Sequence, residues 1–192
     1  MAPNHAEVQW FRTDEKKEAF ESLKFANRLI DEVAADPYYW KWVILAVHGA
    51  LQATMVLALT GSTQLRVLSE KSKKEVAERE DGVRKLADFM DLYRMVKRKS
   101  DMEIFIYSKP LQSSGGMDED VAYLHRLRNN FTHFLPSGWS VRIDELPRVL
   151  NSCISIIGFL AFEANNVFWY ENPTGDEMRA LVTEFQAKVK GR

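Results

Sequence analysis

The stretch from Trp42 to Leu59 constrains the fold most, because it is nearly uninterrupted apolar sequence over 18 residues. Such a run either spans a membrane or forms a central helix that other helices cover. His48, Gln52 and Thr54 place polar groups within it that are costly in lipid. Because the flanking segments have the amphipathic pattern of a soluble bundle, we expect a central core helix and no membrane association.

Apolar residues recur at three- and four-residue spacing along most of the chain, and no segment alternates for long enough to indicate a strand. This pattern predicts an all-α fold, an antiparallel bundle of four to six helices forming a single domain over residues 1–192. The expected helices are 14–35, 37–59, 83–98, 118–134, 144–166 and 174–189, with a short extra turn within 101–107. Residues 61–82 and 108–117 are expected to be mobile connections, and in the lysine- and glutamate-rich part of the first we expect helix but little tight packing.

Capping residues predict several of these helix ends. Asp36 followed by Pro37 is typical of an N-cap with proline at the first helical position. Asp118 is the expected N-cap of the fourth helix. Thr174 and Glu177 match a capping box, which predicts the start of the last helix.

Composition limits the classes of function. A net charge of -1 excludes a chain coated in basic surface, so a nucleic acid would have to be held by a local patch. Residues 71–74 and 97–99 contain basic clusters, although such runs are more often solvated helix faces. The single Cys153 excludes an internal disulfide and a cysteine-based zinc site, and its apolar neighbours predict a packing residue. Residues 1–12 lack the apolar core of a signal peptide, so we expect a cytoplasmic protein.

Residues 125–134 concentrate imidazole, guanidinium and amide groups in a segment with the pattern of an amphipathic helix. At about 100° per residue, the predicted core-facing stripe consists of Leu124, Leu127, Phe131 and Phe134. The groups nearly opposite that stripe are His125, Asn129 and His133, with Arg126 and Arg128 on the two flanks. We therefore expect the polar groups to point away from the core of the chain, toward water or a second protomer.

These residue types suit phosphodiester chemistry, because arginine binds oxyanions and histidine transfers protons near neutral pH. Attack of a ribose 2′-hydroxyl on its neighbouring phosphate needs a proton acceptor, a proton donor and positive charge on the phosphorane. Two histidines and two arginines from a symmetric pair of chains would supply all three. We expect no metal and no cofactor, because groupings such as His5 near Glu7 lack a credible ligand set.

The segment from Arg128 through Asn129 to His133 resembles the signature of the HEPN superfamily, small helical proteins with an arginine, a polar residue and, after four to six residues, a histidine. The resemblance implies a homodimer in which two such helices face each other across a cleft that takes RNA or a nucleotide. In active members it implies metal-independent RNA cleavage leaving 2′,3′-cyclic phosphate ends. Arg128 would bind the scissile phosphate, Asn129 would orient groups by hydrogen bonding and His133 would move protons. The supporting residues are His125, Arg126 and Asn130, and Arg126 also fits the spacing with a six-residue gap.

The same resemblance implies a toxin or defence component with an antitoxin protein as partner. Some toxin members carry a tyrosine two residues after the histidine, where a partner nucleotidyltransferase modifies them. This chain has Leu135 at that position, so we do not expect that mode of neutralisation. Two alternatives stay open: a non-catalytic HEPN-like module that binds a nucleotide or a protein in the same cleft, and a polar helix face that only hydrogen-bonds a loop.

Two further groups of residues have more than one interpretation. His48 and Gln52 lie four residues apart on the central helix, where they either reach the same cleft or form a satisfied core pair, the commoner case. Five aromatic residues could stack on nucleobases, but aromatic residues at helix ends more often anchor the core or an interface. These residues are Trp40, Trp42, Trp139, Trp169 and Tyr170.

Overall fold

The computed structural model describes residues 9–79, 82–133, 136–170 and 173–192. Within these residues it contains eight α-helices, three short 3-10 helices and no strand beyond one isolated backbone bridge, so the all-α prediction is confirmed. The α-helices are α1 (Glu15–Leu29), α2 (Tyr39–Thr60), α3 (Glu70–Glu78), α4 (Phe89–Lys97), α5 (Lys99–Met102), α6 (Met117–Thr132), α7 (Leu146–Phe162) and α8 (Gly175–Lys190).

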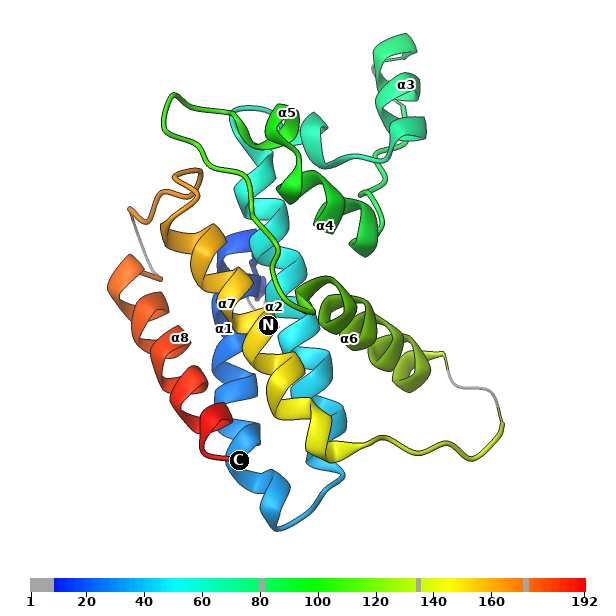
Figure 1. The fold of residues 1–192 in the computed structure, drawn as a ribbon. Helices are drawn as coiled ribbons and strands as arrows, with labels where there is room; N and C mark the ends of the chain where they lie inside the picture. The colour runs from blue at the N-terminus through cyan, green and yellow to red at the C-terminus, as the bar shows by residue number, and fades with distance from the viewer. Residues whose placement is uncertain (1–8, 80–81, 134–135, 171–172) are drawn as a thin grey trace, which may run out of the picture.

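The apolar run forms the central helix α2, as the sequence predicts. Helix α1 runs antiparallel to α2, and α7 and α8 form a second antiparallel pair (Figure 1). Helix α7 packs against α2, while α6 packs on both α2 and α7 at the opposite side from α8. The short helices α4 and α5 pack at one end of α2, and α3 projects beyond them (Figure 1). This arrangement leaves one side of α6 without a covering helix among the described residues.

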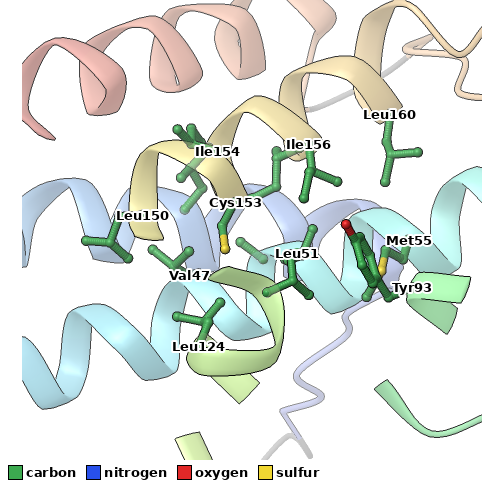
Figure 2. Close-up of a cluster of buried hydrophobic side chains, with 14 of the residues drawn as sticks. Val47, Leu51, Met55, Tyr93, Leu124, Leu150, Cys153, Ile154, Ile156 and Leu160 are labelled. Atoms are coloured by element: carbon green, nitrogen blue, oxygen red, sulfur yellow. The ribbon is translucent and has the colours of Figure 1, made fainter. Parts of the chain in front are cut away.

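One part of the hydrophobic core lies where α2, α6 and α7 meet. In Figure 2 the Cys153 side chain of α7 points toward Leu51 of α2 and Leu124 of α6, and all three residues are fully buried. The packing role predicted for Cys153 is therefore confirmed. Burial of these apolar side chains provides most of the driving force for holding α6 on the bundle.

Two helical segments, Tyr39–Thr60 and Ile143–Phe162, are long and apolar enough to cross a membrane. In the most apolar window of the first, 67% of the residues are buried inside the molecule, and in the second 50%. Burial of this extent in α2 is typical of a core helix in a helical bundle.

The first two helices begin and end near their expected residues. Helix α1 ends at Leu29 and continues as a 3-10 helix, Ile30–Ala34, to almost the predicted boundary. Asp36 is not the N-cap of α2, which begins at Tyr39. Its carboxylate instead accepts a hydrogen bond from the backbone N–H of Tyr38 at 2.8 Å, which makes a turn before the helix.

The region after α2 differs most from expectation. Residues 61–82 were expected to lack tight packing, but Val67, Leu68 and Ser72 are buried. The predicted helix 83–98 begins only at Phe89, because the backbone before it pairs with residues 67–69 through an antiparallel bridge between Leu68 and Leu86. Long-range backbone pairing has overridden the local helical pattern here.

The ends of α6 and α7 also differ in detail. Gly116, with a φ of 82°, precedes α6, and the predicted cap Asp118 lies in the first turn. The Asp118 carboxylate accepts a hydrogen bond from the Tyr93 hydroxyl at 2.7 Å and lies 2.8 Å from the Lys97 ammonium. Helix α7 ends at Phe162, before the predicted 166, because Asn165 adopts a left-handed φ of 59°. The predicted capping box of Thr174 and Glu177 is confirmed at α8.

Candidate functional site

Five of the six residues singled out in the sequence lie on helix α6, and the sixth, His133, is the residue that follows its last turn. Leu124 and Leu127 are buried as predicted, and Phe131 is only partly buried. Phe134, the fourth member of the predicted stripe, lies outside the described residues, as does Leu135.

The expected orientation of His125 and Asn129 is wrong. Both side chains are half-buried: His125 turns toward α2, where it bonds His48, and Asn129 bonds the other nitrogen of the His125 ring. The physical reason is that α2 supplies a buried hydrogen-bonding partner, His48, to which His125 can turn. His48 bonds His125 of α6 and not Gln52. Of the two interpretations of His48, the one in which it reaches the polar residues of α6 is therefore the one observed.

Four side chains form a continuous hydrogen-bonded network, which we call the α6 network. Arg128 Nη1 lies 2.9 Å from Asn129 Oδ1, and Asn129 Nδ2 lies 3.1 Å from His125 Nε2. His125 Nδ1 in turn lies 3.0 Å from His48 Nε2, across 77 residues of sequence. The network thus runs from the buried face of α2 to the half-buried Arg128.

The direction of every hydrogen bond in the α6 network follows from its arginine end. A guanidinium only donates, so Asn129 Oδ1 must accept and the amide nitrogen Nδ2 must donate. His125 Nε2 is then an acceptor, and its proton sits on Nδ1, from which it donates to His48 Nε2. Both imidazoles are therefore neutral, each with its proton on Nδ1. A second proton on either ring would put two donors face to face.

The surroundings of both rings favour the neutral form. Phe89 of α4 stacks on His48 at 4.0 Å and on His125 at 4.8 Å between ring centroids. Burial, with smaller contributions from His125 and the positive charge of Arg128, lowers the pKa of His48 to about 3. Burial and Arg128 also lower the pKa of His125, although nearby Asp88 acts against them.

Arg128 is consequently the charged member of an otherwise neutral network. It forms no ion pair with a carboxylate of the described residues, whereas Arg98, Arg142 and Arg148 each contact an aspartate. A neutral amide holds its side chain instead. A guanidinium that is positioned in this way keeps its charge available for an anionic ligand.

His133, Arg126 and Asn130 lie on the outer side of α6. His133 caps the helix through its backbone N–H, which donates to the Asn129 carbonyl at 2.8 Å, and its side chain is exposed. The Arg126 guanidinium carbon lies 4.8 Å from the centre of the Tyr123 ring, so it stacks on that ring while exposed. Asn130 is also exposed.

The structure does not bring Arg128 and His133 together within one chain. No hydrogen bond among the described residues joins them, and their spacing turns about 140° around an ideal helix. Arg126 and His133, seven residues apart, share the outer face more closely. A ligand that touches both Arg128 and His133 must span the edge of α6 or meet a second chain.

Sequence reasoning missed Phe89, and it left the place of His48 open. Neither has a local signal, because both approach His125 from segments far away in the sequence. Among the described residues, no group of three or more histidine, cysteine or carboxylate side chains is placed to hold a metal ion. His5 and Glu7 lie outside the described residues.

Comparison of this chain with family models, with curated proteins and with solved structures gives no match.

Proposed function

We propose that this chain is a metal-independent endoribonuclease of HEPN type, which acts at a cleft between the α6 helices of two cytoplasmic protomers. The observation that carries the proposal is the α6 network, in which Arg128 is held by a neutral amide and has no carboxylate partner among the described residues. A fully hydrogen-bonded network of this kind holds its members in one arrangement, which a site for an anionic ligand requires.

In this proposal Arg128 stabilises negative charge on the phosphorane, and Asn129 fixes the guanidinium in place. His133 is the proton-transferring group, because its imidazole is exposed at the end of α6. His125 and His48 act as positioning residues, since His125 Nε2 accepts the hydrogen bond of the Asn129 amide and His48 in turn holds the His125 ring. Because one chain does not place its own His133 near Arg128, the second protomer supplies the histidine that acts together with Arg128. A role as a toxin or defence component with a protein antitoxin belongs to the same proposal.

The test is cleavage of single-stranded RNA by purified protein in EDTA. We expect the wild type to cleave and both Arg128→Ala and His133→Ala to lose activity by a factor of about 100 or more. Arg126→Ala is the matched control, because it removes a guanidinium from the same helix and lies outside the α6 network. Equal cleavage by wild type and both folded variants, or loss with Arg126→Ala alone, would refute the assignment of Arg128.

The alternative is a non-catalytic module that binds a nucleotide or a protein in the same place. The separation of Arg128 and His133 within one chain favours this non-catalytic module, because binding, unlike catalysis, does not require the two side chains to act on the same phosphate. Thermal stabilisation by a nucleotide without turnover, abolished in Arg128→Ala, would support this alternative over catalysis.

A further inference from the structure

A cavity of about 390 Å³ lies at the end of α6, outside the α6 network. It is lined by Tyr38, Lys41, Asn130, Phe131, Trp139 and Val141. These residues come from the start of α2, the last turn of α6 and the connection that returns from α6 to α7 (Figure 1). We call it the Tyr38–Trp139 cavity.

Aromatic rings form much of the lining of the Tyr38–Trp139 cavity. The Trp139 and Phe131 rings meet edge to face at 4.6 Å between centroids, which fixes Trp139 against the bundle. Tyr38 remains 62% exposed and Trp139 40% exposed, so ring surface is left open to a ligand. Exposed aromatic surface beside a cavity is suited to stacking against a flat ring.

Besides the Tyr38 hydroxyl and the Trp139 indole N–H, the Tyr38–Trp139 cavity is lined by one cation and one amide. The Lys41 ammonium lies 5.5 Å from the Tyr38 ring centre and 4.7 Å from that of Trp42, and it forms no ion pair with a carboxylate of the described residues. Asn130 adds an exposed amide with both donor and acceptor atoms. No acidic residue is among the lining residues. The chemistry therefore fits a planar ring that carries polar edges and a neighbouring negative charge.

The position of the cavity next to the candidate site indicates which flat anionic ligand it binds. Asn130 belongs to the segment between Arg128 and His133, so the cavity and the proposed reacting groups share the last turns of α6. A single-stranded RNA offers an unpaired base next to a phosphate, whereas a duplex keeps its bases stacked inside the helix.

We propose that the Tyr38–Trp139 cavity binds one unpaired nucleobase of a single-stranded RNA, with Lys41 at the adjacent phosphate. The inference rests on the proposed function for its substrate class. It adds a base-binding subsite that would hold the strand in register with Arg128 and His133 and would exclude double-stranded RNA.

The test measures binding of a fluorescently labelled single-stranded RNA of about ten nucleotides to the His133→Ala protein, which prevents cleavage. We expect Tyr38→Ala to weaken binding about 5- to 100-fold, and Trp139→Phe, which keeps an aromatic ring against Phe131, to weaken it less. Lys41→Gln should reduce the slope of log affinity against log salt by about 0.7, the value for one phosphate contact on a single strand. Tyr170→Ala is the matched control, since Tyr170 is 83% exposed and stacks on Phe168 away from the cavity.

The nucleobase subsite and the nuclease proposal fail separately. If the wild type cleaves no RNA but Tyr38→Ala weakens RNA binding, the nuclease proposal is wrong and the subsite stands. If cleavage requires Arg128 and His133 while Tyr38→Ala and Trp139→Phe bind RNA as the parent does, the subsite is wrong. Weaker self-association of these two variants with unchanged RNA binding would show that the cavity is an interface between copies, and would also overturn the subsite.

Discussion

Acid should destabilise this protein through His48, by an amount that follows from its surroundings. Burial, with smaller contributions from His125 and Arg128, lowers the pKa of His48 to about 3, below the 6.5 of an unfolded histidine. Between these two pH values the unfolded chain binds a proton that the native chain does not. Stability is therefore highest above pH 6.5 and falls as the pH drops toward 3. At about 1.4 kcal/mol per pH unit, the 1.5 units from 6.5 to 5 correspond to about 2 kcal/mol.

Urea unfolding of the wild type and of His48→Gln at pH 7 and pH 5, at one protein concentration, measures this effect. Glutamine keeps an acceptor oxygen for His125 Nδ1 but does not titrate. We expect the wild type to lose about 2 kcal/mol more than His48→Gln between the two pH values. Phe89→Leu, which keeps the imidazole and an apolar neighbour, is the control and should retain the wild-type pH dependence. Parallel losses in wild type and His48→Gln would show that His48 is not held neutral, and the reasoning on the α6 network would be wrong.

Three further changes test the fold. Leu124→Ala removes a fully buried side chain between α6, α2 and α7 and should cost about 3 kcal/mol of unfolding free energy in urea; a loss below about 1 kcal/mol would contradict the packing. Thr174→Ala breaks the capping box of α8 and should cost about 1 kcal/mol by the same measurement, whereas no change would place the helix start elsewhere. Burial raises the pKa of the Cys153 thiol, so iodoacetamide should label it only in denaturant; rapid labelling of native protein would argue against a buried thiol.

Periodicity and caps were enough to predict the helical class and most of the long helices. The apolar run became the buried α2, and Thr174 with Glu177 opens α8 as a capping box. These features are local, because each depends on residues within a few turns of one another. The predicted start of α4 was wrong because Leu86 pairs with Leu68, and a local sequence pattern does not reveal a contact between such distant residues.

The candidate site was predictable in its residues but not in its arrangement. The helical projection placed His125 and Asn129 opposite the core stripe, since it took only α6 into account. The structure turns His125 toward α2 because His48 and Phe89 approach from distant segments. The spacing to His133 singles out Arg128 in the sequence, whereas in the structure Arg128 is distinguished by the neutral amide that holds it.

Two measurements in EDTA test the central proposal most directly: the chemical nature of the ends of the cleaved RNA, and the cleavage of a substrate that lacks one 2′-hydroxyl. The linkage that the wild type cuts is mapped, and a second substrate carries a single 2′-deoxy sugar on the 5′ side of that linkage. We predict 2′,3′-cyclic phosphate ends and no cleavage at the deoxy linkage, because the neighbouring 2′-hydroxyl is the attacking group. Products with 3′-hydroxyl ends, or unchanged cleavage of the deoxy linkage, would contradict the chemistry proposed for Arg128 and His133.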